Sequence, residues 1–254
     1  MKEVQLLFDL YDDRKLAKIK TRFPILERDI VLDAGCGPGY RTLEAASICF
    51  AVVAVDHSKF CLGELERKLH AVPHYGPRTH VVLADIQHLP FRDGSFTKVI
   101  CTDALEHVDH DRIAVKEFKR TLITNGLLYV AVPARGAEEF LCHLDRTQLW
   151  RRGHVRTYDL EALPALLRSE GFQVFCTERS GFFRALYHLA QILLGVTIER
   201  ETGAPLRSRK ANTFFFRVWR VAKPLYRSRI GMAIDKSGAS LLARALEIYA
   251  KKIG

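Results

Sequence analysis

The sequence predicts an α/β protein with a doubly wound, mostly parallel sheet and a helical insertion near the C-terminus. Short apolar runs recur along the first 180 residues, and several are continuous enough for strands buried on both faces. Four of these runs end at or just before an aspartate, and the first leads into a glycine-rich turn. Because ligands of open parallel sheets bind beyond the carboxyl ends of the strands, this pattern predicts a ligand site at that edge.

Residues 1–22 are predicted to form a helix that precedes the sheet. Apolar side chains recur there at roughly helical spacing, with aspartate and lysine between them. They are Leu6, Leu7, Leu10, Tyr11 and Leu16. Apolar positions at this spacing usually belong to a core, so this helix is expected to pack on the sheet.

Residues 30–39 form the centre of the predicted site, because an apolar strand passes through Asp33 into three closely spaced glycines. These let the backbone turn tightly and approach a ligand without an intervening Cβ; they are Gly35, Gly37 and Gly39. The predicted helix at 40–47 would offer unpaired N–H groups to the same ligand. A pyrophosphate needs no carboxylate here, whereas Asp33 suits a ligand with a cationic amino-acid end, such as S-adenosylmethionine.

Three further apolar runs support this interpretation, because each ends beside an aspartate. They are 51–55 before Asp56, 81–84 before Asp85, and 99–102 before Asp103. Any one of these aspartates could instead cap the helix that follows it. Four in succession are expected to gather at one sheet edge and to contact a ligand there.

With these motifs, residues 30–180 closely resemble the class I S-adenosylmethionine-dependent methyltransferases, in particular the branch of quinone-biosynthesis and other small-molecule enzymes. The matching motifs follow the family's order and spacing: Val31–Gly39, Val55–Ser58, Ala84–Phe91, Leu105–Val108, Gly153–Tyr158 and Gly171–Phe172. The resemblance implies a seven-stranded, Rossmann-like methyltransferase sheet with a reversed strand at its edge. It also implies S-adenosyl-L-methionine as the cofactor and methyl transfer as the activity.

The resemblance assigns a set of cofactor-binding residues. Asp56, which lies 17 residues after Gly39, would accept hydrogen bonds from the ribose hydroxyls. His57 would lie along the adenine face, Asp85 would accept from the exocyclic amine, and the Ile86 N–H would meet a ring nitrogen. The full set is Asp33, Gly35, Cys36, Gly37, Gly39, Asp56, His57, Asp85, Ile86 and Thr102.

The resemblance also allows the N-terminal segment 1–28 to act as a helical lid, with Phe8 or Tyr11 near the methionine end of the cofactor. Packing on the sheet and closing over the site both remain open. One domain is expected for the whole chain. Its parts would be the N-terminal segment, a cofactor-binding core at 29–180, a basic helical insertion at 181–238 and a last strand within 239–254.

The residues after the strand at 99–102 disfavour two kinds of acceptor. Family members that methylate exocyclic amines carry an Asn/Asp-Pro-Pro-aromatic run there, whereas this chain has Thr102-Asp103-Ala104-Leu105. Cytosine-C5 methylation needs a thiolate nucleophile, but Cys101 lies inside an apolar strand and is expected to be core. Methyl transfer would then need in-line positioning and, for some acceptors, removal of a proton.

His154 and His107 are the candidate catalytic bases. His154 follows an irregular, charged stretch and could equally be a surface histidine, while His107 could brace a strand-to-helix turn. Asp103 and Glu106 beside His107 also resemble the magnesium site of some O-methyltransferases of quinone and small-RNA modification. Similar Leu-Glu-His-Val runs occur in metal-free relatives, so we expect no metal and no loss of activity with EDTA.

Residues 181–238 depart from the family pattern. Within them, residues 207–229 contain eight Lys or Arg and no acidic residue, and residues 213–227 fit an amphipathic helix. Its apolar face would carry Phe214, Phe215, Val218, Trp219, Ala222 and Tyr226. Three interpretations remain open: an interfacial helix on an anionic membrane, a cover for the substrate pocket or a homodimer face, and a nucleic-acid groove with stacking aromatics.

Charge and composition limit the cellular setting. The net charge of +10 suggests an acidic partner, either a nucleic acid or an anionic membrane. The six cysteines include no Cys-x-x-Cys pair, which favours reduced thiols in the cytoplasm. No signal segment and no apolar run of about 20 residues is present. The expected location is cytoplasmic, with peripheral attachment to the inner membrane face as an extension.

Together these features predict an S-adenosylmethionine-dependent methyltransferase that acts on oxygen or carbon of a small or lipid-like acceptor. An RNA methyltransferase is the first alternative, favoured by the charge. A cofactor-binding partner subunit without catalysis is the second. Retention of all four aspartates argues against the latter.

Overall fold

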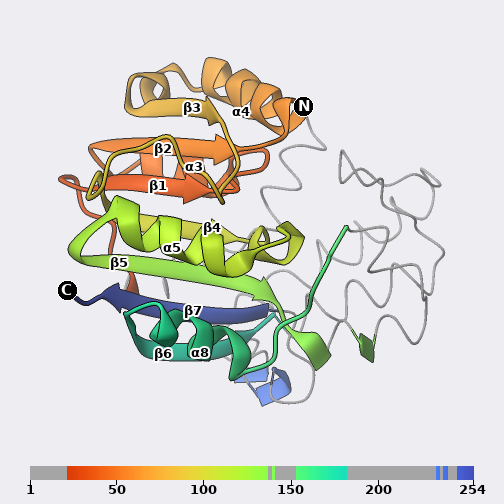
Figure 1. The fold of residues 1–254 in the computed structure, drawn as a ribbon. Coiled ribbons are helices and arrows are strands. Elements are labelled where there is room, and N and C mark those ends of the chain that lie inside the picture. The colour runs from red at the N-terminus through yellow and green to blue at the C-terminus, as the bar shows by residue number, and fades with distance from the viewer. Residues whose placement is uncertain (1–21, 137–138, 141–152, 182–232, 235–236, 240–244) are drawn as a thin grey trace, which may run out of the picture. The chain divides into compact units, whose positions relative to one another are not determined.

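The computed structural model describes residues 22–136, 139–140, 153–181, 233–234, 237–239 and 245–254. Its strands join one seven-stranded sheet with the order β3-β2-β1-β4-β5-β7-β6 (Figure 1). The strands are β1 (Ile30–Ala34), β2 (Ala51–Asp56), β3 (Thr79–Leu83), β4 (Phe96–Thr102), β5 (Leu122–Pro133), β6 (Phe172–Ser180) and β7 (Ala245–Lys252). The described helices are α3 (Tyr40–Ala46), α4 (Lys59–Ala71), α5 (Asp111–Thr121) and α8 (Ala162–Ser169), with 3-10 turns η1 (Pro73–Arg78) and η2 (Leu105–His107).

The sheet confirms the predicted doubly wound, mostly parallel class. β1 pairs in parallel with β2 and β4, β2 with β3, and β4 with β5. The order turns back at β1, so the carboxyl ends of β1 and β4 flank the point where ligands of such sheets bind. The reversed strand was expected at the edge, but β7, whose arrow opposes β5 and β6, lies one position inside, between them (Figure 1).

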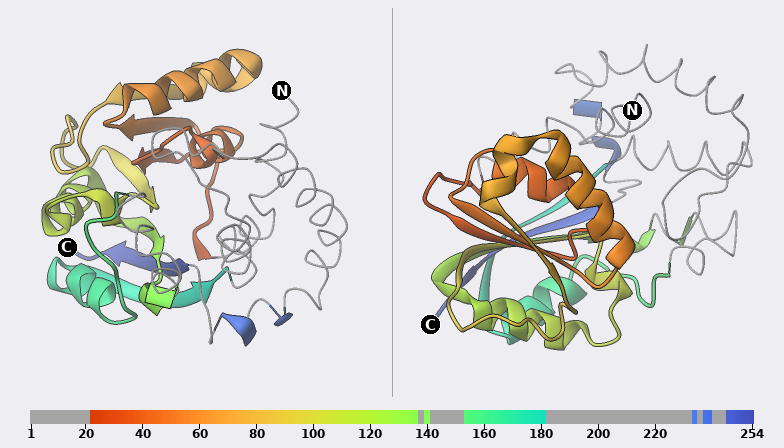
Figure 2. Two further views of the ribbon diagram at one scale, coloured as in Figure 1. Left: turned by 90° about the vertical axis from the view of Figure 1, so that its right-hand side faces the viewer. Right: turned by 90° about the horizontal axis from the view of Figure 1, so that it is seen from above.

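Helices cover both faces of the sheet. Figure 2 shows α4 on one side and α5 and α8 on the other. Leu43 of α3 and Leu62, Leu65 and Leu69 of α4 form one core cluster around Ala54 of β2. β1 and β2 are apolar up to Asp33 and Asp56, and β4 is apolar over Val99–Cys101, as expected for parallel strands covered by helices on both faces.

A buried ion pair lies at the amino end of the central strands. Lys98 Nζ of β4 is 3.3 Å from Asp29 Oδ2, and both residues are buried. The same carboxylate accepts hydrogen bonds from Thr97 Oγ1 at 2.8 Å and from the Leu26 N–H at 2.7 Å. Asp29 therefore fixes the entry into β1 against the neighbouring β4.

The described residues fall into two compact units. One contains those of 22–131, 164–176 and 248–254, and the other contains those of 132–163 and 177–247. Every residue predicted to bind the cofactor belongs to the first unit. In the second, the Arg135 N–H donates to the Tyr158 carbonyl at 3.0 Å, and Ser180 Oγ donates to Glu247.

Phe8, Tyr11 and most of the proposed lid lie outside the described residues, and so does the basic segment 207–229. From the lid segment, Phe23 is described and fully buried. No helix in the described part of the chain combines the length and the apolar character needed to cross a bilayer. The four-part division of the chain stays a prediction.

Candidate cofactor site

The glycine turn after β1 is closed on two sides and open on one. Gly35 and Gly39 have φ angles of +74° and +84°, and an added Cβ would lie 2.3 Å from Ala104 Cβ and 2.2 Å from Leu65 Cδ1, respectively. Glycine is therefore required for packing at both positions. At Gly37, with φ of +51°, an added Cβ would meet no described atom within 4 Å. The middle of the turn thus leaves room for a ligand beside the backbone.

Asp33 is a fully buried carboxyl group in the middle of this site. Thr42 Oγ1 of α3 donates to its Oδ2 at 2.6 Å, while no group among the described residues donates to its Oδ1. Burial raises the pKa of Asp33 from 3.8 to about 6, although the Thr42 hydrogen bond and the nearby Arg41 oppose that shift. A buried carboxylate with an oxygen to spare is suited to a cationic ligand group.

Asp56 holds the glycine turn as well as facing the predicted ribose site. At the end of β2, its Oδ2 accepts from the Gly37 N–H and its Oδ1 from the Ser58 N–H, both at 2.8 Å. A carboxylate has about four lone-pair sites, so two remain for other donors. His57 Nδ1 lies 3.7 Å from Asp56 Oδ1, on a side chain that is 82% exposed. The sequence indicated a ligand role for Asp56 but not its hydrogen bond to the Gly37 N–H.

Asp85 and Ile86 follow β3, beside the end of β2. The Ala84 N–H donates to the Asp56 carbonyl at 3.1 Å, which extends the pairing of the two strands toward the site. Asp85 Oδ1 accepts from the Gln87 N–H at 2.8 Å, and Ile86 is buried. The predicted adenine-binding segment is therefore an ordered turn.

Lys68 is a residue of this region that the sequence analysis missed. From α4 its Nζ donates to the Pro38 carbonyl at 2.6 Å and lies 4.3 Å from the centroid of the Tyr40 ring. Burial lowers the pKa of Lys68 to about 8. Thirty residues separate Lys68 from Pro38, so no local motif could have indicated the contact. Lys68 and Asp56 thus bind adjacent residues of the turn, Pro38 and Gly37.

The end of β4 carries the other predicted residues. Thr102 is half-buried at the last strand position, and Asp103 follows in a left-handed conformation, φ 49°, with its N–H bonded to the Ala131 carbonyl at 2.8 Å. His107 ends η2, with Nε2 3.9 Å from Oε1 of the buried Glu106. Cys101 is fully buried, and burial raises the pKa of its thiol well above 9.0, so the predicted core role is confirmed.

Cys36, the one cysteine of the predicted cofactor-binding set, is buried in the glycine turn, and burial raises the pKa of its thiol as well. His154 lies in the second unit, within irregular backbone, and is half-buried. Its role as a base, like that of His107, stays a prediction. The expectation of metal-independent activity also stays a prediction.

Comparison with known proteins places these features in a family context. Residues 32–130 match the family described as a methyltransferase domain. A probable S-adenosylmethionine-dependent methyltransferase of Mycobacterium tuberculosis is 30% identical over 142 residues, which are 56% of this chain and 48% of that protein. A malonyl-[acyl-carrier protein] O-methyltransferase of Hamiltonella defensa is 27% identical over 60% of this chain and 53% of that protein. The chain thus spans about half the length of these relatives.

Solved structures agree on the fold. The [4+2]-cyclase SpnF has a TM-score of 0.63 and 21% identity, covering 95% of this chain and 82% of that one. Phosphoethanolamine N-methyltransferase 2 of Haemonchus contortus, solved with S-adenosyl-L-methionine, also has a TM-score of 0.63, with 18% identity over 95% of this chain and 53% of that one. At such identities the likeness concerns the fold alone.

Proposed function

We propose that this chain, which carries a class I S-adenosylmethionine-dependent methyltransferase domain, transfers a methyl group to oxygen or carbon of a small or lipid-like acceptor. The observation that carries the proposal is the buried Asp33 carboxyl group, whose Oδ1 receives no hydrogen bond from the described residues. The open side of Gly37 lies in the same turn. Both features suit a ligand that brings an ammonium group and a nucleoside to one place.

The residues of the site divide the work of holding this cofactor. The bound cofactor supplies an activated methyl group on a sulfonium. Asp33 would bind the amino group, Asp56 the ribose hydroxyls, and Asp85 with the Ile86 N–H the adenine ring. Gly37 leaves the nucleoside free to approach. The chain then aligns donor and acceptor, and where the acceptor carries a proton, His107 or His154 would remove it.

The cofactor part of the proposal predicts a large loss of binding in Asp56→Ala. The substitution removes acceptors for the ribose and releases the Gly37 N–H, and a charge-assisted hydrogen bond contributes about 1.5–3 kcal/mol. We expect the affinity for S-adenosylhomocysteine, measured by titration calorimetry, to fall roughly 10- to 150-fold. NAD should not bind the wild type. An unchanged affinity in the variant would place the nucleoside elsewhere.

An oxygen or carbon acceptor is proposed because the residues at the end of β4 fit neither a thiolate nucleophile nor amine methylation. The names of several relatives and the basic segment 207–229 also support it. Cys101 is a buried thiol rather than a thiolate, and the run Thr102–Leu105 is not an amine-methylation motif. Three relatives are named O-methyltransferases, and they come from Penicillium expansum, Hamiltonella defensa and Enterobacter lignolyticus. The basic aromatic segment 207–229 would suit an anionic membrane surface from which a lipid-like acceptor could be drawn. RNA and a non-catalytic role remain the alternatives.

A methyl-transfer assay separates these acceptors. Radiolabelled S-adenosylmethionine incubated with the protein should label material in a lipid or quinone extract, and not RNA. Labelled RNA would favour the first alternative, and no labelling despite cofactor binding would favour the partner subunit.

Binding of the protein to phosphatidylserine vesicles should weaken with added salt, because salt screens the attraction between the basic side chains and the anionic lipid. It should not vanish, since burial of aromatic side chains is insensitive to salt.

A further inference from the structure

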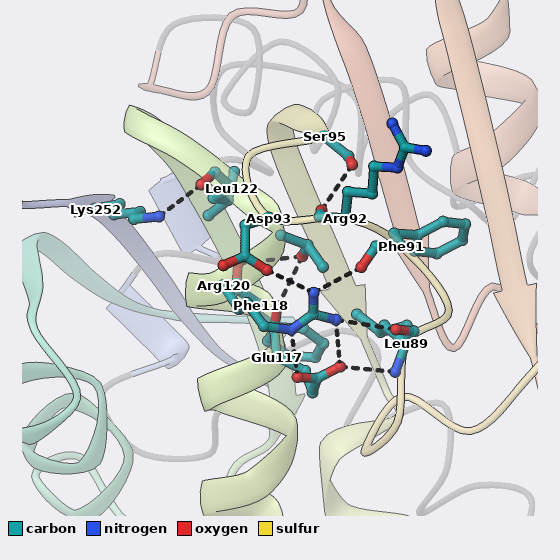
Figure 3. Close-up of polar contacts among 11 residues, drawn as sticks. Leu89, Phe91, Arg92, Asp93, Ser95, Glu117, Phe118, Arg120, Leu122 and Lys252 are labelled. Atoms are coloured by element: carbon teal, nitrogen blue, oxygen red, sulfur yellow. Dashed lines mark hydrogen bonds and ion pairs between the residues drawn. The ribbon is translucent and has the colours of Figure 1, made fainter.

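The side chain of Arg120 in α5 forms hydrogen bonds with three residues of the segment between Asp85 and Ser95. Arg120 donates to the Leu89 carbonyl at 3.0 Å, the Phe91 carbonyl at 2.6 Å and Asp93 Oδ1 at 2.9 Å (Figure 3). In return, the Gly94 N–H donates to the Arg120 carbonyl at 3.0 Å. One side chain thus satisfies two loop carbonyls that would otherwise depend on solvent.

Glu117 completes the attachment one turn earlier on the helix. Its Oε2 accepts from the Leu89 N–H at 2.8 Å, and its two oxygens accept from Arg120 Nε at 2.7 Å and Nη2 at 2.8 Å (Figure 3). The Arg120 hydrogen bond holds the pKa of Glu117 below its usual range, so the pair is charged at neutral pH. Leu89 therefore has its N–H bound by Glu117 and its carbonyl by Arg120.

The other end of the same helix holds the start of the segment. The His110 N–H, just before α5, donates to Gln87 Oε1 at 3.0 Å. The amide nitrogen of Gln87 donates in turn to Asp85, at 3.0 Å from Oδ2 and 3.2 Å from Oδ1. Ile86 between them is buried. Asp85 is thus connected to α5 through Gln87, and the chain beyond it through Glu117 and Arg120.

We propose that Glu117 and Arg120 are positioning residues, which act through the Asp85–Leu89 turn to place the Asp85 carboxylate and the Ile86 N–H against adenine. This inference rests on the proposed cofactor function. Neither α5 residue would touch the cofactor. They would affect adenine recognition because a turn outside helices and strands is held in one conformation mainly by its hydrogen bonds to neighbouring elements.

The geometry of arginine is needed for this role. A guanidinium presents five N–H donors in a rigid plane, whereas an ammonium presents three donors at one point on a flexible stem. Lysine at position 120 would keep the charge beside Glu117 but could not reach Glu117, Asp93 and the two carbonyls together. Arg120→Lys therefore loosens the turn while keeping the charge of the helix.

Adenine recognition can be measured apart from stability by comparing two ligands. S-inosylhomocysteine has a carbonyl in place of the adenine amine, so Asp85 would face an acceptor and the Ile86 N–H would face a donor. We expect the wild type to bind S-adenosylhomocysteine at least ~10-fold more tightly, as expected for a lost hydrogen bond to a charged group. Arg120→Lys should narrow that ratio to below ~3-fold, because a mobile turn recognises the ring edge less well.

Arg112→Lys is the matched control, since it changes an arginine of the same helix that contacts Glu170 and Ser169 rather than the turn. It should keep the wild-type ratio. A purely structural role for Arg120 would lower the melting temperature and leave the ratio unchanged, and that result would overturn the inference. If the wild type bound neither ligand, the cofactor proposal itself would fail.

Hydrogen exchange on the wild type gives a test that needs no variant. The Leu89 and Gly94 amides should be protected without ligand, although they lie outside regular secondary structure, because Glu117 and Arg120 accept from them. Bound S-adenosylhomocysteine should then slow exchange at Ile86. If Leu89 exchanges as fast as an unbonded amide, α5 does not hold the turn in solution and the inference is wrong.

Discussion

Replacing Lys98 with methionine is expected to lower the free energy of unfolding by about 3–5 kcal/mol, the range for breaking a buried ion pair on one side. Lys98 Nζ lies 3.3 Å from Asp29 Oδ2, and the residues are only 7% and 4% exposed. Methionine keeps most of the side-chain volume, so the loss comes from an Asp29 charge left without its cation. Urea unfolding followed by circular dichroism measures the change.

Arg135→Met provides the comparison on the surface. Arg135 Nε is 2.7 Å from Glu139 Oε1, but the two side chains are 53% and 54% exposed. Water solvates both charges there, so this change should lower the free energy of unfolding far less than Lys98→Met does. Equal losses in Lys98→Met and Arg135→Met would mean that burial does not govern the contribution of the Asp29 pair.

The second large effect concerns Asp33→Asn, which should stabilise the protein without ligand while weakening cofactor binding. The folded-state pKa of about 6 lies above the ordinary 3.8, so the buried carboxylate costs on the order of 3 kcal/mol at neutral pH. The asparagine amide carries no charge, but its buried NH₂ group near the former Oδ1 position would lack an acceptor, which costs about 1 kcal/mol. The net gain at pH 7 should be about 2 kcal/mol.

The pH dependence gives the sign of this effect. Because burial raises the Asp33 pKa, the folded state binds the proton more tightly than the unfolded state does. The resulting stability is fully present below about pH 4 and is lost as the pH rises through about 6. Denaturation curves of wild type and Asp33→Asn should therefore diverge between these values.

Cofactor affinity completes the test of Asp33. Loss of a charged partner for the amino group should weaken S-adenosylhomocysteine binding by roughly 10- to 150-fold in titration calorimetry at pH 7. The variant would thus be more stable and bind less, as expected where a functional charge is kept at a cost in stability. A variant that bound normally would show that Asp33 does not face the amino group.

Local sequence was sufficient to predict most of the fold. Apolar runs and the aspartates beside them indicated β1 to β4 within a few residues, because buried parallel strands carry a continuous apolar pattern. The glycine turn could also be predicted from the sequence. Gly35 and Gly39 have a positive φ and lie close to neighbouring side chains, so few other residues fit there. The place of β7 between β5 and β6 was not predicted, because pairing partners are not encoded in a strand's own pattern.

The sequence by itself was sufficient to predict a methyltransferase fold, the class of cofactor and the residue types at the edge of the sheet. Only the tertiary structure decided how those residues act on one another. In the folded chain Asp33 is buried, and its Oδ1 accepts no hydrogen bond from the described residues, while Asp56 accepts one from the Gly37 N–H. Lys68 and Arg120 donate to backbone carbonyls that lie 30 and 31 residues away in sequence. Such contacts depend on packing between distant segments, and desolvation acts on a carboxyl group only once the chain has folded around it.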